Sequence, residues 1–303
     1  MPRERNVVTL LFAGLAGVLP YAARAQEKPK VVATFSILGD LARNVGGDRV
    51  EVSTLVGPDG DAHVYSPTPA DGRRLAEAKL VVANGLKLEG WMGRLIKSSG
   101  TKARVIEGAK GVQPVKAEGE QGHGHPHADI DPHAWQSVPN VKLYVANIRD
   151  GLIAADPAGK ADYEGNAAAY LAKLDALDAE IKAAVERIPR DRRKIITSHD
   201  AFGYFQKAYG IAFVAPQGVS TEAEASAKDV ARIIQQIRRE KVPAVFLETI
   251  SEQRLAARIA KESGAKIGGR LYSDALSAEG GPAGTYIDMM RHNITALSAA
   301  LSS

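Results

Sequence analysis

The 303-residue sequence contains no cysteine. This absence excludes disulfide bonds, catalytic thiols and thiolate metal ligands, and it also excludes the acylated cysteine of a bacterial lipoprotein. Any metal site must therefore be built from nitrogen and oxygen ligands. Methionine is scarce as well, at four residues, and this scarcity disfavours a copper(I) site.

Long hydrophobic runs are missing, apart from one near the N-terminus. Residues 1–25 combine a basic start, an apolar run and a small-residue Ala-Arg-Ala site that ends at Ala25. These features are typical of a secretory signal peptide, and the run is too short to span a membrane. We expect cleavage near Ala25 and a soluble protein in the periplasm, with a retained membrane anchor as the alternative.

A strong charge of one sign is also missing. The chain has 39 lysines and arginines against 35 aspartates and glutamates, and loss of residues 1–25 removes three arginines and one glutamate, which leaves a net charge of +2. The arginines form no basic stripe of the kind that phosphate binding needs, so nucleic acid is excluded as a partner. The sequence also lacks GxSxG, GxxxxGK[ST], GxGxxG and HExxH motifs.

Short apolar runs alternate with helical patterns in two successive sets. The first set of expected strands covers 30–36, 50–57, 80–85 and 103–108, and the second covers 194–199, 211–216, 244–249 and 265–273. This alternation predicts an α/β fold with two lobes, each a mostly parallel sheet flanked by helices. The expected parts are an N-terminal lobe, a linker helix and a C-terminal lobe, at residues 29–155, 156–189 and 190–303.

The longest regular pattern lies between these two sets. Apolar residues recur every three or four positions from Tyr163 to Ile188, and Pro157 and Pro189 flank the pattern. The spacing predicts one helix of at least about 27 residues, about 40 Å long. We expect this helix to be a rigid link between the lobes.

Three histidines occupy similar settings near the ends of predicted strands. His63 lies in "GDAHVYSPTP", where prolines restrict the backbone, His133 lies in "DPHAW", and His199 ends "KIITSH". Ligands bind at the carboxyl ends of strands in open α/β sheets, so a ligand shared by these histidines would lie between the lobes. Each histidine taken alone also fits a hydrogen-bonded structural role.

Asp274 in "LYSDALS" follows the last predicted strand and either joins these histidines or caps a helix. Three imidazoles and one carboxylate suit Zn²⁺ and are tolerable for Mn²⁺. We expect Asp200 and Glu248 to orient the imidazoles. His292 is expected to be an ordinary packing or surface residue.

Residues 119–129 form a Gly- and His-rich stretch without periodicity, which is typical of a mobile loop. Its alternating His123, His125 and His127 cannot be preorganised as a tight site. They either collect metal weakly, as an auxiliary metal loop, or are simply solvated.

A set of short motifs in this order resembles the zinc/manganese substrate-binding proteins of ABC importers (ZnuA-like, cluster A-I). The resemblance covers essentially the whole mature chain and is carried by "GDAHVYSPTP", "NGLKLEGW", "DPHAW", "SHDAFGYF", "FLETISEQ" and "LYSDALS". It implies two α/β lobes joined by a long helix, with metal in the cleft. It also implies a monomer that is not an enzyme and that delivers metal to an inner-membrane permease with a separate ATPase subunit. A periplasmic metallochaperone is a further candidate partner.

The resemblance places the family's ligands on His63, His133, His199 and Asp274. Many manganese-specific members have glutamate at the third position, so His199 and the His-rich loop resemble the zinc branch, with manganese or mixed binding as the alternative. A secreted zinc hydrolase and a heme, siderophore or cobalamin carrier are the competing functions. Four protein ligands leave no open position for a reactive water, which favours carriage. Capture is expected to weaken below about pH 6.5, because metal displaces protons from histidine.

Overall fold

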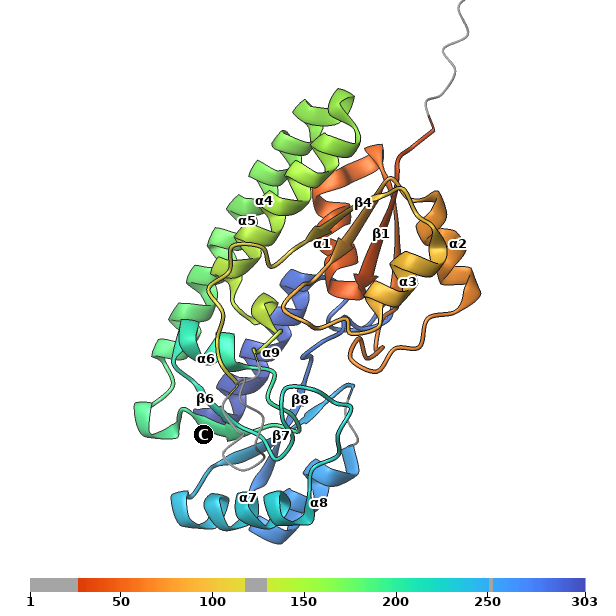
Figure 1. Cartoon of the computed structure of the whole chain (residues 1–303). Coiled ribbons are helices and arrows are strands. Elements are labelled where there is room, and N and C mark those ends of the chain that lie inside the picture. The colour runs from red at the N-terminus through yellow and green to blue at the C-terminus, as the bar shows by residue number, and fades with distance from the viewer. Residues whose placement is uncertain (1–26, 118–129, 251–252, 303) are drawn as a thin grey trace, which may run out of the picture.

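A computed structural model describes residues 27–117, 130–250 and 253–302. It confirms the α/β class, with one four-stranded parallel sheet in each lobe. Figure 1 shows the first lobe above the second. The first lobe contains β1 (Lys30–Phe35), α1 (Ser36–Gly46), β2 (Glu51–Val56), α2 (Pro69–Glu77), β3 (Leu80–Ala83), α3 (Met92–Ser99) and β4 (Arg104–Glu107).

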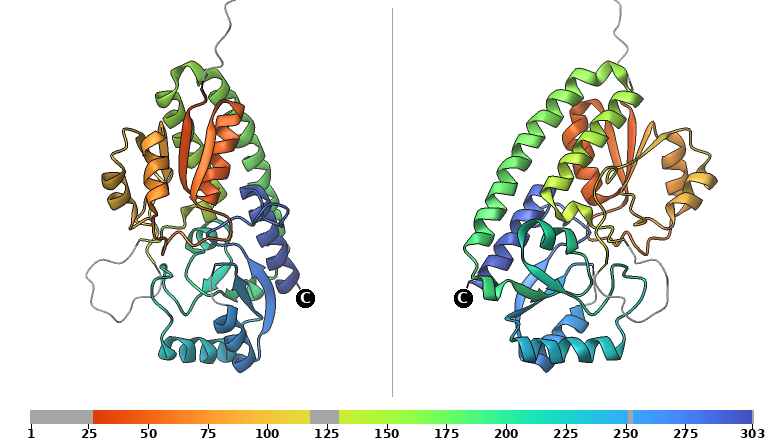
Figure 2. Two further views of the ribbon diagram at one scale, coloured as in Figure 1. Left: turned by 90° about the vertical axis from the view of Figure 1, so that its right-hand side faces the viewer. Right: turned by 60° about the vertical axis from the view of Figure 1, so that its left-hand side comes forward.

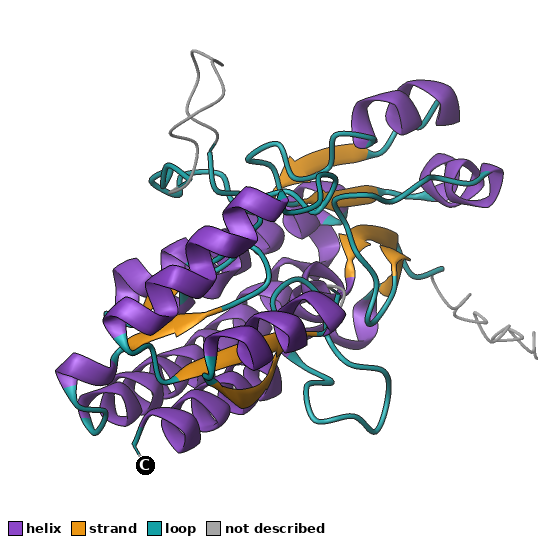
Figure 3. Cartoon of the chain, turned by 90° about the horizontal axis from the view of Figure 1, so that it is seen from below, coloured by secondary structure: helices purple, strands orange, loops and turns teal. Residues whose placement is uncertain are grey.

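Two long helices and the second lobe complete the described part of the chain. They comprise α4 (Val138–Ala155), α5 (Lys160–Glu186), β5 (Lys194–Ile196), α6 (Gly203–Tyr209), β6 (Ala212–Val214), α7 (Ala227–Glu240), β7 (Ala244–Glu248), α8 (Gln253–Ser263), β8 (Lys266–Leu271) and α9 (Tyr286–Leu301). Seen from below, the strands lie among the helices (Figure 3). Within the described residues, no helix combines the length and apolar character that crossing a membrane requires.

The two sheets have the same strand order, β2-β1-β3-β4 in the first lobe and β6-β5-β7-β8 in the second. All eight strands predicted from apolar runs are present, and each is shorter than its run. The central strand β3 is buried along its whole length, which is why it reads as an unbroken apolar run. In each sheet, successive connections lead to opposite sides of the first strand, and this change of direction opens a crevice at the carboxyl ends of the strands.

The predicted long helix is α5, which has 27 residues and is therefore about 40 Å long. One face is buried, formed by Tyr163, Ala167, Tyr170, Leu174, Leu177, Ile181, Ala184 and Val185. The helix runs along one side of the molecule from the first lobe to the second (Figures 1 and 2). It packs against α4 and α1 on the first lobe and against the C-terminal α9.

A second connection between the lobes was not predicted. Residues 272–285, which follow β8, return to the first lobe before α9 begins. The backbone N–H of Asp59 donates to the carbonyl of Leu276 at 2.9 Å, and the N–H of Leu276 donates to Ser36 Oγ at 3.0 Å. The N–H of Tyr286 donates to Asp40 Oδ2 at 2.9 Å. This segment is therefore fixed to the first lobe although it follows a strand of the second.

Candidate metal centre

Four side chains that follow strands meet between the lobes. His63 comes after β2, His133 after β4, His199 after β5 and Asp274 after β8. All four residues are buried, and one potential ligand atom from each lies within 4.8 Å of the others. The alternative assignment of Asp274 as a helix cap is wrong, because the next helix, α9, is capped by Thr285.

Asp274 lies at the centre of the group. Its Oδ1 is 3.3 Å from His133 Nε2, and its Oδ2 is 3.0 Å from His199 Nε2 and 4.0 Å from His63 Nε2. The Nε2 atoms of His63 and His133 are 3.2 Å apart. Within the described residues, Asp274 Oδ1 is buried and makes no hydrogen bond. Buried polar atoms without a partner are costly, and a bound cation would supply that partner.

His133 is oriented by an aspartate two residues before it. Asp131 Oδ1 accepts the backbone N–H of His133 at 2.8 Å and lies 2.8 Å from its Nδ1. A proton on Nδ1 leaves the lone pair on Nε2, the atom that faces the other site residues. Asn84, just after β3, donates to the carbonyl of Pro132 at 2.9 Å and fixes the same turn.

An aspartate two residues before His63 holds its backbone, as Asp131 holds that of His133. Asp61 Oδ1 accepts the backbone N–H of His63 at 2.8 Å. The other oxygen, Asp61 Oδ2, accepts a hydrogen bond of 2.6 Å from Thr221 Oγ1, which belongs to the second lobe. One carboxylate therefore holds the His63 turn and also connects the two lobes.

His199 is oriented by Glu248, the last residue of β7. Glu248 Oε1 accepts the backbone N–H groups of Ser198 at 2.6 Å and of His199 at 3.0 Å, and Oε2 lies 2.6 Å from His199 Nδ1. The structure thus places Glu248 where we expected an orienting residue. Asp200 donates its backbone N–H to the carbonyl of Gly218, and an orienting role for its side chain stays a prediction.

The two tryptophans of the chain support neighbours of site residues. Trp91 donates its indole N–H to the carbonyl of Ala62, the residue before the first histidine, at 2.8 Å. Trp135 donates to the carbonyl of Ser273, the residue before the aspartate, also at 2.8 Å. Both bonds are buried, so each fixes the backbone next to a side chain of the site.

The electrostatics of the site favour the protonation states that a metal needs, with one exception. Burial lowers the pKa of His63 to about 3, which leaves this imidazole neutral. Burial opposes ionisation of Asp274, but His133 and His199 outweigh burial and lower its pKa. Burial also lowers the pKa of His199, whereas the carboxylates of Glu248 and Asp274 raise it well above its usual value. These two carboxylates therefore favour a proton on His199, and a metal ion would compete with that proton.

Sequence reasoning missed Asp131 and Asp61. The signal for the aspartates was present, because each stands two residues before its histidine, a spacing at which aspartate accepts backbone N–H groups. His123, His125 and His127 lie outside the described residues. His292 lies on α9, and its Nε2 is 3.0 Å from the carbonyl oxygen of Arg270 on β8.

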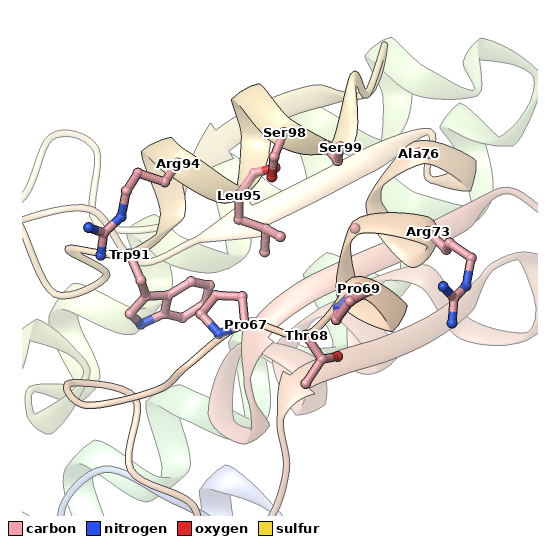
Figure 4. A pocket seen from close by; sticks show the side chains of 11 residues that line it. Pro67, Thr68, Pro69, Arg73, Ala76, Trp91, Arg94, Leu95, Ser98 and Ser99 are labelled. Atoms are coloured by element: carbon pink, nitrogen blue, oxygen red, sulfur yellow. The ribbon is translucent and has the colours of Figure 1, made fainter.

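A separate groove lies away from the four site residues. A groove of about 700 Å³ separates α2 from α3 (Figure 4). Pro67, Trp91 and Leu95 line it, with Arg73 and Arg94 at its sides, and none of the four site residues contributes to it. Its shape carries no evidence of function, whereas the buried donor set between the lobes has a specific chemistry.

Comparisons with known proteins agree with that chemistry. The family model for the periplasmic zinc-uptake complex component A (ZnuA) matches residues 31–300. The manganese ABC transporter substrate-binding lipoprotein PsaA of Streptococcus pneumoniae is 33% identical over 313 residues, covering 100% of both chains. The iron-binding protein YfeA of Yersinia pestis is 34% identical over 306 residues, covering 98% of this chain and 96% of YfeA.

Solved structures give the same result for the fold. The periplasmic zinc-binding protein TroA of Treponema pallidum has a TM-score of 0.83 and 33% identity, covering 91% of this chain and 100% of TroA. PsaA is named as the substrate-binding part of an ABC transporter, and the three relatives are named for different metals: manganese, iron and zinc. The chain belongs to the family of extracytoplasmic metal-binding proteins, not enzymes, that serve ABC importers.

Proposed function

We propose that this protein captures one Zn²⁺ ion between its lobes and delivers it to a membrane permease powered by a separate ATPase subunit. The proposed ligands are His63, His133, His199 and Asp274. The observation that carries the proposal is the convergence of four buried ligand atoms within 4.8 Å of one another. Three imidazole nitrogens and one carboxylate oxygen match the tetrahedral coordination that Zn²⁺ prefers.

A manganese or mixed carrier is the second candidate. Among the relatives, PsaA is named for manganese and TroA for zinc. Mn²⁺ prefers more ligands and more oxygen than this site offers, whereas imidazole suits Zn²⁺. The nitrogen-rich donor set therefore favours zinc.

The proposed location is the periplasm, after cleavage near Ala25. PsaA is named a lipoprotein, but this sequence has no cysteine that could carry a lipid. We therefore propose that the protein diffuses freely between the site of capture and the permease.

A competition titration tests the proposed function. Metal-free protein lacking residues 1–25 is titrated with Zn²⁺ and Mn²⁺ against a chromophoric chelator. We expect one tightly bound Zn²⁺ that equimolar Mn²⁺ does not displace. Comparable binding of Mn²⁺ would support the mixed carrier, and no binding of either ion would contradict both candidates.

Two variants connect this binding to the proposed ligands. His63→Ala should lower zinc affinity by more than the about 10–100-fold that loss of an outer-shell partner costs. His292→Ala is the matched control, because His292 lies on α9, outside the site, and its zinc affinity should stay unchanged. Equal affinity in the two variants would remove His63 from the site.

A further inference from the structure

Gly203 is the first residue of α6 in the second lobe, within the "SHDAFGYF" motif. Its φ angle is not positive, so the backbone does not require glycine. A Cβ atom at this position would lie 2.5 Å from Asp131 Oδ2. That distance is shorter than real Cβ contacts, so a side chain at residue 203 would displace either Asp131 or α6.

Asp131 cannot move without releasing His133. The aspartate is 1% exposed, and its Oδ1 holds both the backbone N–H and the Nδ1 of His133 at 2.8 Å. A cavity of about 380 Å³ lies beside Asp131 and Gly203. This cavity gives a displaced carboxylate room to move.

Helix α6 is held on several sides. The ring of Phe202, the residue before Gly203, stacks on Phe213 with centroids 4.5 Å apart. Tyr204 Oη accepts the backbone N–H of Val115 at 3.2 Å. These contacts leave the carboxylate of Asp131 as the group that must give way.

We infer that Gly203 is a positioning residue for the metal site. The missing side chain lets the second lobe close directly onto Asp131, and Asp131 then holds His133 with Nε2 facing the other proposed ligands. Gly203 touches no metal ligand in this scheme and acts only through Asp131. The inference rests on the proposed function, because its consequence is tighter capture of the ion.

The first test measures zinc affinity in Gly203→Ala. We expect a loss of about 10–100-fold, the usual cost of disturbing an outer-shell partner. The matched control is Gly93→Ala at the second position of α3, where a Cβ would meet nothing within 4 Å. An unchanged affinity in Gly203→Ala would overturn the inference.

A double-mutant cycle separates positioning from a general structural role. In an Asp131→Ala background the clash is absent, so Gly203→Ala should cost nothing further. An equal loss in both backgrounds would overturn the inference. If Gly203→Ala alone does not fold, recovery of folding on adding Asp131→Ala supports the contact, and failure to recover contradicts it.

A metal-free readout distinguishes failure of this inference from failure of the proposed function. In ¹⁵N-labelled protein without metal, the Nδ1–H signal of His133 should be protected from exchange in the wild type and lost in Gly203→Ala. A signal that persists in Gly203→Ala contradicts the positioning role, whatever ion the wild type binds.

Discussion

Each histidine of the site depends on a carboxylate outside the proposed ligand set. Asp131 faces Nδ1 of His133, and Glu248 faces Nδ1 of His199. Such partners fix the tautomer and raise the basicity of the atom that binds metal. The same carboxylates also strengthen the binding of a proton to the imidazole. Protons therefore compete with the metal ion at each of these histidines.

Proton release on zinc binding tests this competition. Glu248 and Asp274 raise the pKa of His199, so the metal-free site should hold a proton there at pH 7. Zinc must displace this proton. Zinc affinity should therefore increase as the pH rises toward the pKa of His199 in the metal-free protein, and it should decrease as the pH is lowered. Glu248→Gln removes one carboxylate, lowers that pKa and should reduce proton release at pH 7.

Calorimetry in buffers of different ionisation enthalpy measures the released protons. Glu164→Gln, an exposed position on α5, is the control and should behave as the wild type. No proton release from the wild type at pH 7 would show that His199 is already neutral. The pKa of His63, lowered to about 3 by burial, implies that this residue contributes no proton.

Local settings singled out the three histidines and left Asp274 open, and the family resemblance completed the set of four; not all of their partners were predicted. Glu248 was expected because it lies near the site in the sequence. Asp61 and Asp131 were missed although both stand two residues before a histidine. The role of Gly203 depends on a contact between lobes, which no local pattern of the sequence reveals.

At the scale of elements, the site is held by the turns that follow strands and by the helices beside them. Trp91 precedes α3 and holds the carbonyl of Ala62 at 2.8 Å. Trp91→Phe should leave this buried carbonyl without a donor, at a cost of about 1–3 kcal/mol. We expect weaker zinc binding, because the His63 turn loses its anchor.

Zinc titration and denaturant unfolding of Trp91→Phe measure the two effects. Tyr163→Leu, a buried aromatic change on α5 away from the His63 turn, controls for loss of packing. Equal zinc affinity in Trp91→Phe and the wild type would contradict an anchoring role.

Helix α5 is an element that should matter for stability alone. Leu174 is fully buried on its inner face, so Leu174→Ala should lower the free energy of unfolding by about 2–5 kcal/mol. Lys173→Ala, on the exposed face, should change it by less than about 0.5 kcal/mol. Chemical denaturation of both variants checks this, and zinc affinity of the folded proteins should be unaltered.

The elements themselves were largely predictable because their signals are local. Buried parallel strands produce unbroken apolar runs, and α5 produces a repeat of three and four residues. The strands were predicted to extend further than they do. Residues such as His199 and Thr249 continue the pattern of the strand in the sequence, but they belong to the turns that build the site.

At the scale of the whole molecule, the lobes are connected by α5, by residues 272–285 with α9, and by a hydrogen bond across the site. The bond from Thr221 Oγ1 to Asp61 Oδ2, 2.6 Å long, joins the second lobe to the His63 turn. Thr221→Val removes it, and a bond to a charged group contributes about 1.5–3 kcal/mol. Zinc should then dissociate about tenfold faster or more.

Stopped-flow transfer of zinc to an excess of chelator measures this rate. Thr221→Ser keeps the hydroxyl and should retain slow release. A dissociation rate in Thr221→Val that equals the wild-type rate would show that this bond does not hold the lobes together.

The return of residues 272–285 to the first lobe could not be predicted from the sequence. Its contacts, such as Leu276 with Asp59 and Ser36, join residues more than 200 positions apart, and no local periodicity reports them. Asp274 was therefore expected to belong to the second lobe. Its segment is held by both lobes, which places the only carboxylate of the proposed ligand set at the junction.

Zinc K-edge X-ray absorption of the protein loaded with one equivalent of Zn²⁺ tests the central claim most directly. The account predicts four nitrogen and oxygen neighbours at about 2.0–2.1 Å, with the multiple scattering of three imidazoles. His199→Ala should lose one imidazole. Five or six neighbours, or fewer than three imidazoles in the wild type, would contradict a closed His₃Asp site built for carriage.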